Sequence, residues 1–417
     1  MAKFMVVGGN RLQGKVTVSG SKNACLPILA ATLLYPGETV VHRVPQLRDV
    51  EVMCEVLQHL GAKVVREGDT VIVNARALQN WEVNEDMTRR MRASNLVLGP
   101  LLGRYQRANV SYPGGCDIGS RPMNLHLKGM AALGARITER FGYILAETTG
   151  LYGTELHLDM PSVGATENMM MAAVLAAGTT LIRNAAREPE IVDLQNFLNQ
   201  MGADIRGAGS DVIKIKGVRC LRATEHTVIP DRIEAGTHMI AAVMTGGDVT
   251  VSDVIPEHLD SLTAKLKEIG AYITVEEDSI RVVARGRPRA VDVKTLFYPG
   301  FPTDLQPQLM ALLTIAEGTS IITEMVFENR YKHVSEFRRM GADITVEGQT
   351  AIIKGVHKLS GAVVEAPDLR AGAALVLAAL GAENGSIIEN IEHIDRGYEC
   401  LERKYNALGA RMIRVHS

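Results

Sequence analysis

The feature that most constrains this chain is an internal repeat. Among the places where a hydrophobic residue is followed by Gly-Ala, six are regularly spaced, and successive copies of these lie 68 to 73 residues apart. The glycines of these tripeptides are Gly61, Gly134, Gly202, Gly270, Gly341 and Gly409. Self-similarity at a fixed period is the signature of repeated structural units, so the sequence predicts six copies of one unit.

Each of these glycines follows a segment with the periodicity of an amphipathic helix. In residues 256–269, leucine and isoleucine recur on one helical face, and Gly270 is expected to end the helix in a left-handed conformation. Two short strands, 272–275 and 280–283, are predicted to follow.

A second kind of helix, apolar nearly all round, lies upstream of the amphipathic one, as in residues 168–177 and 371–379. A helix without a polar face must be buried. The predicted unit is therefore strand, buried helix, strand, exposed helix, strand, strand, which is an α/β architecture. Single cores stop growing near about 250 to 300 residues, so two domains of three units each are expected. These are residues 21–229, and residues 1–20 together with 230–417.

The composition excludes several classes of protein. A formal charge of -2 provides no global field to attract nucleic acid or a membrane surface. The N-terminus lacks the apolar segment of a signal peptide, and no apolar run reaches the ~18 residues of a membrane span. The five cysteines are widely spaced without a CxxC pair, which argues against a disulfide framework or a zinc site. A cytoplasmic protein without a metal is expected.

The sequence contains no complete motif for binding a nucleotide cofactor or a catalytic metal. Residues 9–15 resemble a phosphate-binding loop, but Val16 stands where a magnesium-binding hydroxyl is needed. Residues 16–19 alternate like a strand, and the segment is interpreted as a hairpin. No HExxH motif and no GxGxxG after a strand occurs, so metal hydrolysis and nicotinamide chemistry have no support.

Polar residues mark the start of every buried helix. For Ser162, Asp231, Asp304 and Asp368, an N-cap role is at least as well supported as catalysis by the sequence alone.

Basic residues at the same positions fit a cap poorly. Lys22, Arg92 and Arg370 oppose the helix macrodipole at a helix N-terminus, so an anion is expected near them. A second set of arginines lies at or near the entry to the exposed helices: Arg48, Arg121, Arg330 and Arg396.

Residues 112–122 place a cysteine among turn-forming residues. Their Pro and Gly content predicts a surface loop, which leaves Cys116 accessible. The nearby Arg121 favours its thiolate form. The alternative is an incidental free thiol.

Ten short segments connect the chain to a known family. They span residues 20–24, 91–94, 113–116, 162–166, 187–190, 230–232, 301–304, 327–330, 368–370 and 393–398. Together and in this order they resemble the UDP-N-acetylglucosamine 1-carboxyvinyltransferases, which are enolpyruvyl transferases. The resemblance covers essentially the whole chain.

This resemblance implies a two-domain inverted α/β barrel with six βαβαββ repeats and an active site in the cleft between the domains. It also implies transfer of the enolpyruvyl group of phosphoenolpyruvate to the 3′-hydroxyl of UDP-N-acetylglucosamine, the first committed step of peptidoglycan synthesis. Fosfomycin alkylates the matching cysteine in the family. No cofactor is implied, and a monomer or weak homo-oligomer is expected.

The resemblance also implies roles for particular residues. Cys116 matches a proton donor that forms a covalent adduct with phosphoenolpyruvate, Asp304 a general base, and Lys22 a catalytic cation. Asn124 and Met160 depart from the family, where many relatives have Asp and some use Lys. The implied substrate-binding residues are Lys22, Asn23, Arg92, Arg121, Pro122, Met123, Asn124, Leu125, Ser162, Val163, Gly164, Asp304, Val326, Arg330, Asp368, Arg370 and Arg396.

Two alternatives stay open. A 3-phosphoshikimate enolpyruvyl transferase shares the fold and the phosphoenolpyruvate chemistry but has no equivalent of the Pro-Gly-Gly-Cys loop. A non-catalytic sugar-nucleotide binding protein is expected to have lost Cys116 or Asp304, and both are present.

Overall fold

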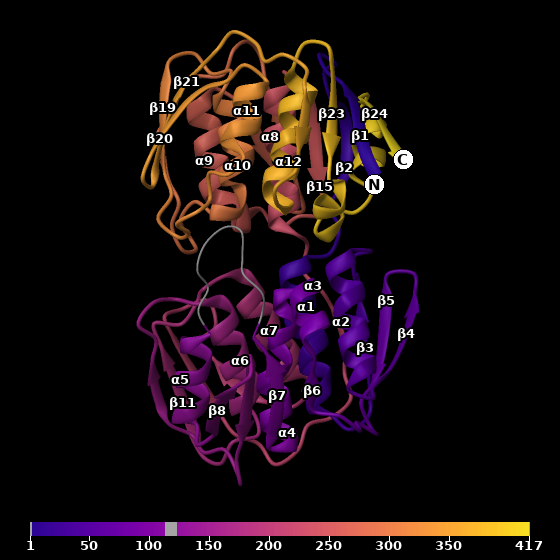
Figure 1. The fold of residues 1–417 in the computed structure, drawn as a ribbon, viewed down its shortest axis with the longest axis vertical. Coiled ribbons are helices and arrows are strands. Elements are labelled where there is room, and N and C mark those ends of the chain that lie inside the picture. Colours follow the sequence, from indigo (N-terminus) through magenta and orange to yellow (C-terminus); the bar gives the residue numbers. More distant parts are fainter. Residues whose placement is uncertain (1, 113–122, 417) are drawn as a thin grey trace. The chain divides into compact units, whose positions relative to one another are not determined.

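The computed structural model of the chain describes residues 2–112 and 123–416. Cys116, Arg121 and Pro122 lie outside the described residues. The described residues form two compact units. The first unit comprises residues 20–112 and 123–229, and the second comprises residues 2–19 and 230–416. Figure 1 gives the course of the chain and the labels of its elements.

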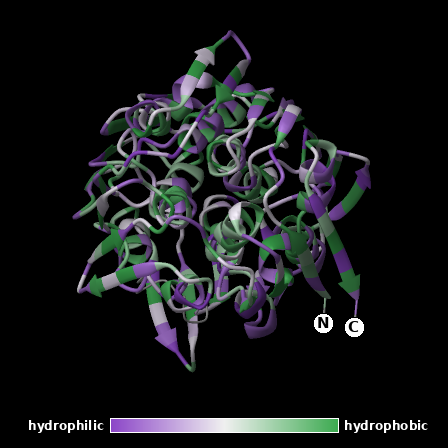
Figure 2. Cartoon of the chain, turned by 90° about the horizontal axis from the view of Figure 1, so that it is seen from above, coloured by the Kyte–Doolittle hydropathy of each residue, from purple (hydrophilic) through white to green (hydrophobic). Residues whose placement is uncertain are grey.

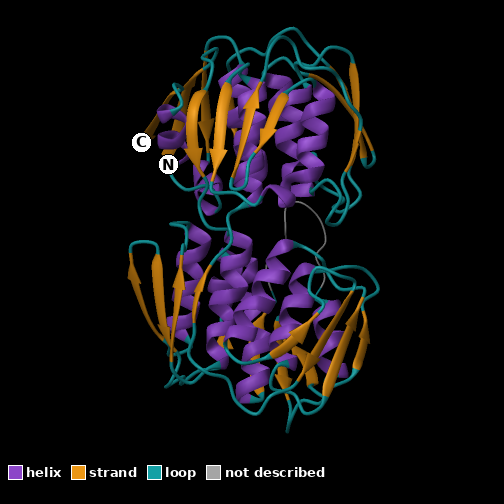
Figure 3. Cartoon of the chain, turned by 180° about the vertical axis from the view of Figure 1, so that it is seen from behind, coloured by secondary structure: helices purple, strands orange, loops and turns teal. Residues whose placement is uncertain are grey.

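The described residues contain six four-stranded sheets, three in each unit. Every sheet has one parallel pair of strands, followed by two neighbours that complete it in antiparallel fashion. In each unit, helices lie on the inside and the sheets cover them (Figure 3). The prediction of an α/β fold made from six copies of one unit is confirmed.

The sheets of the first unit have the orders β14-β3-β5-β4, β6-β7-β9-β8 and β10-β11-β13-β12. Their strands are β3 (Glu38–His42), β4 (Lys63–Glu67), β5 (Thr70–Asn74), β6 (Glu82–Val83), β7 (Arg107–Ser111), β8 (Arg136–Arg140), β9 (Tyr143–Glu147), β10 (Glu155–His157), β11 (Thr179–Arg183), β12 (Asp204–Arg206), β13 (Val212–Lys216) and β14 (Glu225–Thr227). Its helices are α1 (Lys22–Ala31), η1 (Thr32–Leu34), α2 (Arg48–His59), α3 (Glu85–Arg90), η2 (Arg92–Val97), α4 (Leu98–Tyr105), α5 (Asn124–Ala132), α6 (Val163–Ala173) and α7 (Pro189–Gln200).

The sheets of the second unit have the orders β16-β17-β15-β2, β18-β19-β21-β20 and β22-β23-β1-β24. Their strands are β1 (Ala2–Val7), β2 (Gln13–Thr17), β15 (Asp248–Ser252), β16 (Tyr272–Val275), β17 (Ser279–Val283), β18 (Val293–Lys294), β19 (Thr319–Thr323), β20 (Asp343–Glu347), β21 (Thr350–Lys354), β22 (Val363–Glu365), β23 (Gly385–Glu389) and β24 (Arg411–His416). Its helices are α8 (Arg232–Met244), η3 (Pro256–Leu259), α9 (Asp260–Ile269), η4 (Thr303–Leu305), α10 (Gln306–Leu313), α11 (Val334–Arg339), α12 (Leu369–Gly381), η5 (Ile391–Arg396) and α13 (Leu401–Ala407).

The hydrophobic pattern explains which elements are buried. All but the last residue of α12 are buried, because the helix has no polar face, whereas α9 buries one side through Leu262, Leu266 and Ile269. Strand residues alternate between buried and exposed, and many strands in Figure 2 accordingly alternate in colour. The six repeat glycines have φ between 91° and 110°, a conformation that suits glycine after a helix.

The interpretation of residues 9–19 as a hairpin is wrong. β1 pairs with β23 and β24, while β2 pairs in parallel with β15 in a different sheet. The sixth repeat supplies three of the four strands of its sheet, namely β22, β23 and β24. β1, from the N-terminal segment, is the fourth strand of this sheet. The local sequence shows an alternating pattern but not which sheet will receive the strand.

Candidate active site

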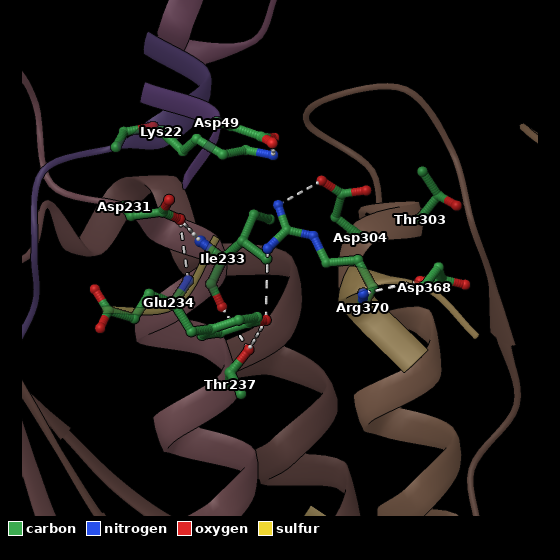
Figure 4. Close-up of polar contacts among 12 residues, drawn as sticks. Lys22, Asp49, Asp231, Ile233, Glu234, Thr237, Thr303, Asp304, Asp368 and Arg370 are labelled. Atoms are coloured by element: carbon green, nitrogen blue, oxygen red, sulfur yellow. Dashed lines mark hydrogen bonds and ion pairs between the residues drawn. The ribbon is translucent and has the colours of Figure 1, made fainter. Parts of the chain in front are cut away.

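The strongest concentration of charge in the second unit is a carboxylate held by two arginines. Oδ1 of Asp304 accepts a hydrogen bond from Nη2 of Arg330 at 3.2 Å, and Oδ2 accepts one from Nη2 of Arg370 at 2.9 Å. The Asp304 side chain is 26% exposed, whereas those of Arg330 and Arg370 are 2% and 5% exposed. The carboxylate is therefore the part of the cluster that is most exposed to solvent. Figure 4 shows its contact with Arg370.

Local structure separates Asp304 from the helix caps. The side chains of Ser162, Asp231 and Asp368 accept backbone N–H groups at the starts of α6, α8 and α12, so the N-cap interpretation is confirmed for these three. For Asp304 that interpretation is wrong, because the residue lies within η4 and its carboxylate pairs with Arg330 and Arg370.

A buried glutamate shapes the backbone around Asp304. Glu324 is fully buried at the end of β19, and its Oε2 accepts a hydrogen bond from Thr303 at 3.0 Å. Its Oε1 accepts bonds from the hydroxyl of Thr295 at 2.7 Å and the backbone N–H of Val326 at 2.9 Å. A carboxylate with several donors is a rigid anchor, so Glu324 fixes both the residue before Asp304 and the predicted substrate contact Val326.

Arg370 stays charged although it is buried. Burial by itself disfavours the guanidinium charge, but the carboxylates of Asp304 and Asp231 more than offset this, and the pKa of Arg370 lies above its ordinary value. Burial also raises the pKa of the neighbouring phenol of Tyr398, which is therefore neutral at pH 7.

The first unit carries a second buried ion pair. Lys22 is the first residue of α1, and its Nζ lies 3.2 Å from Oδ2 of Asp49 in the first turn of α2. The sequence predicted an anion near Lys22 and near Arg370. In the structure, the carboxylate of Asp49 lies beside Lys22, and that of Asp304 lies beside Arg370. Each of the two cations is therefore held in a defined orientation by a carboxylate of the protein.

A buried hydrogen-bond network that includes His126 and Asn168 lies next to the start of α6. Nδ1 of His126 lies 3.0 Å from the amide nitrogen of Asn168, which also donates to the carbonyl of Asn95 at 3.2 Å. Burial, with a smaller contribution from Arg92, lowers the pKa of His126 to about 4, so the ring is neutral at pH 7. The ring faces Gly164, where an added Cβ would lie 3.2 Å from Cε1 of the imidazole.

The remaining predicted residues of the first unit lie at helix starts. Met123 and Leu125 are buried around the start of α5, with the Met123 sulfur 3.0 Å from the amide nitrogen of Asn95, while Asn124 is exposed. Asn23, Arg92 and Val163 are half-buried in the first turns of α1, η2 and α6.

Met160 is exposed, and Lys128 from α5 pairs with the adjacent Asp159 at 3.0 Å. In the second unit, the half-buried Arg396 ends η5.

The described cysteines are poor candidates for catalysis. Burial raises the pKa of Cys25, and it raises that of Cys54 to about 11. Cys220 and Cys400 are exposed. Among residues 2–112 and 123–416, no group of three or more His, Cys, Asp or Glu side chains could hold a metal ion. In the same residues, no helix combines the length and apolar character needed to cross a bilayer.

Sequence reasoning missed Asp49, His126, Glu324 and Gln308 as parts of these clusters. Asp49 follows Arg48, and an acidic residue at the start of an amphipathic helix is too common in sequences to indicate a buried ion pair. The sequence gives one weak indication for Glu324, which is a single carboxylate directly after the apolar strand β19.

The architecture defines the class to which this chain belongs, the enolpyruvyl transferases. The enolpyruvyl transferase NikO from Streptomyces tendae superposes with a TM-score of 0.90 and 25% sequence identity, covering 100% of this chain and 99% of that one. An EPSP synthase from Acinetobacter baumannii shares the fold, with a TM-score of 0.79 and 20% identity over the full length of both chains. The chain therefore has the inverted α/β barrel of this class.

Sequence comparison narrows the class. The pattern of the EPSP synthase (3-phosphoshikimate 1-carboxyvinyltransferase) family matches residues 6–405, and the chain belongs to this family. It is 59% identical to UDP-N-acetylglucosamine 1-carboxyvinyltransferase 1 of Symbiobacterium thermophilum, over 99% of this chain and 95% of that protein. It is 56% identical to the protein of the same name from Carboxydothermus hydrogenoformans, over 100% of this chain and 99% of that protein.

Proposed function

We propose that this protein transfers the enolpyruvyl group of phosphoenolpyruvate to the 3′-hydroxyl of UDP-N-acetylglucosamine and releases phosphate. The observation that carries the proposal is the 59% identity, over nearly the whole length, to a protein named for this activity. Solved EPSP synthases are only 20–21% identical, which makes 3-phosphoshikimate the less supported acceptor.

In the proposed addition step, Asp304 takes the proton of the sugar hydroxyl as the hydroxyl oxygen bonds to C2 of phosphoenolpyruvate. Cys116 delivers a proton to C3 of the same molecule. The exposure of the Asp304 carboxylate above two buried arginines supports its role as the base, because a substrate hydroxyl can reach it.

In the proposed elimination step, C3 loses a proton to the Cys116 thiolate and the bond from C2 to the phosphate oxygen breaks. The products are the enol ether of the sugar nucleotide and free phosphate. Cys116 also forms a covalent adduct with phosphoenolpyruvate in this proposal.

Four cations hold the two anionic groups of phosphoenolpyruvate in this proposal: Lys22, Arg121, Arg370 and Arg396. The preorganised ion pairs of Lys22 and Arg370 support this assignment, because each cation already has a defined orientation. The sugar nucleotide contacts Asn23, Arg92, residues 121–125, residues 162–164, Asp304 and Val326, while Arg330 and Asp368 flank the base.

We place the reaction at the first committed step of peptidoglycan synthesis, in the cytoplasm, without a cofactor, in a monomer or weak homo-oligomer. The test is the release of phosphate from phosphoenolpyruvate by the purified protein. Release is expected with UDP-N-acetylglucosamine and not with 3-phosphoshikimate or without an acceptor. Release with 3-phosphoshikimate alone would replace the proposed acceptor, and no release with either would refute the proposed activity.

A further inference from the structure

One buried hydroxyl joins the three central helices of the second unit. The phenol oxygen of Tyr398 lies 2.9 Å from Oγ1 of Thr237 on α8, 3.0 Å from Nε2 of Gln308 on α10, and 3.5 Å from Nη1 of Arg370 on α12. All four side chains are almost completely buried. Three helices from three successive repeats therefore contact a single oxygen atom.

The directions of these hydrogen bonds follow from one fixed acceptor. Oγ1 of Thr237 lies 2.7 Å from the carbonyl oxygen of Ile233, which can only accept, so Thr237 donates its single hydrogen there (Figure 4). Tyr398 must then donate its own hydrogen to Thr237. Both lone pairs of the phenol oxygen are left for Gln308 and Arg370.

Gln308 can complete this group in only one orientation. Its amide nitrogen lies 3.0 Å from the oxygen of Tyr398 and 3.3 Å from that of Thr237. Each of these hydroxyls already donates its hydrogen elsewhere, so both oxygens can only accept from Gln308. The opposite oxygen, Oε1, is buried without a hydrogen-bond partner among the described residues. An orphaned buried oxygen costs stability, and such costs are expected mainly where function requires them.

The Arg370 guanidinium is held at both ends. Nη1 contacts the Tyr398 oxygen, and Nη2 donates to Asp304 at 2.9 Å. Loss of the phenol oxygen would free one end of this planar group, while the other end is one of the two arginine contacts that orient Asp304.

We propose that Tyr398 and Gln308 are positioning residues, which act through Arg370 to hold the Asp304 carboxylate in its reactive orientation. The inference rests on the proposed function, because the role of Asp304 as a base comes from there. Neither side chain touches a substrate in this scheme.

The test uses Tyr398→Phe and Gln308→Met in the full-length protein. Both variants are expected to lower kcat/KM for phosphoenolpyruvate about 10- to 100-fold, because small displacements of a catalytic group have effects of this size. Gln308→Met is expected to melt at or above the wild-type temperature, since it removes the orphaned oxygen. A role confined to stability would instead lower the melting temperature and leave kcat/KM unchanged, which would contradict the proposal.

Thr263→Val is the matched control. Its hydroxyl is also buried without a partner among the described residues, but it lies on α9, away from the arginines. This variant is expected to gain stability and to keep wild-type kinetics. A loss of activity equal to that of Gln308→Met would overturn the proposal, because any buried polar group would then have the same effect.

A crystal structure of Tyr398→Phe separates this inference from the proposed function. The guanidinium of Arg370 is expected to move away from Asp304, whatever reaction the protein performs. An unmoved guanidinium would overturn the positioning role even in an active enzyme. Lack of activity in the wild type would refute the proposed function and leave this structural readout intact.

Discussion

Nζ of Lys22 and Oδ2 of Asp49 lie 3.2 Å apart, and their side chains are only 11% and 4% exposed. The pair orients the cation at the start of α1 before any substrate binds. Because both charges are largely removed from water, the loss of one partner costs much more than at the surface.

Asp49→Asn is therefore expected to lower the free energy of unfolding by about 3 kcal/mol. It should also raise KM for phosphoenolpyruvate roughly tenfold, because Lys22 loses orientation. Denaturant unfolding and steady-state kinetics measure the two effects. Glu268→Gln, which breaks the exposed pair with Lys265, should change stability by about 0.5 kcal/mol or less. Equal effects of the two substitutions would contradict the buried-pair argument.

Asp304→Asn is expected to reduce kcat about 10²- to 10⁴-fold, the usual contribution of a general base. Binding of UDP-N-acetylglucosamine, measured by calorimetry, should persist and show that the variant is folded. The control is Asp248→Asn, whose carboxylate pairs with Arg281 at the surface and should be dispensable. A variant at position 304 with wild-type kcat would exclude Asp304 as the base.

Cys116→Ser is expected to lose most phosphate release and to acquire no mass increase when treated with fosfomycin. Intact-protein mass spectrometry detects the adduct. Cys400→Ser removes an exposed thiol outside the proposed site and should behave like the wild type in both assays. An adduct that persists in Cys116→Ser and disappears in Cys400→Ser would reverse the assignment.

Gly164→Ala is expected to weaken UDP-N-acetylglucosamine binding about tenfold, because the new methyl group forces the His126 ring or the start of α6 to move. KM for phosphoenolpyruvate should change much less. Gly385→Ala, in the second unit, is the control, because a Cβ added there would lie 3.8 Å from its nearest neighbouring atom. Unchanged nucleotide affinity in Gly164→Ala would show that the start of α6 does not contact this substrate.

Acid should destabilise the protein through His333. Burial lowers the pKa of His333 to about 4, from an ordinary value of 6.5, with Asp368 and Arg330 as its charged neighbours. Between these two values the unfolded chain binds a proton that the folded chain does not, so stability falls as pH falls through this window. The melting temperature of His333→Leu should therefore drop less between pH 7.5 and pH 5 than that of the wild type. The exposed His357→Gln should leave the wild-type drop unchanged.

The fold was predictable because its signals are local and repeated. Each repeat glycine indicates the end of a helix, and the absence of a polar face indicates that a helix is buried. Because these weak patterns recur in six repeats, together they predict the fold. The polar clusters were less predictable. Gln308 and Glu324 act through partners tens of residues away in the chain, and only the packing of helices and strands brings those atoms together. Asp304 shows the same limit at a single position, because an N-cap and a carboxylate paired with arginines have the same sequence signature.

The position of β1 between β23 and β24 also has a consequence for synthesis on the ribosome. All strands and helices of the first unit emerge in one uninterrupted stretch, so that unit can fold while translation continues. β1 emerges before the first unit, but its partner β24 emerges long after it. At about 5 to 20 residues per second, β1 waits roughly 20 to 80 s for that partner. During this interval its apolar side chains, Phe4 and Val6, are exposed to solvent and chaperones, so the second unit is completed only after β24 has been synthesised.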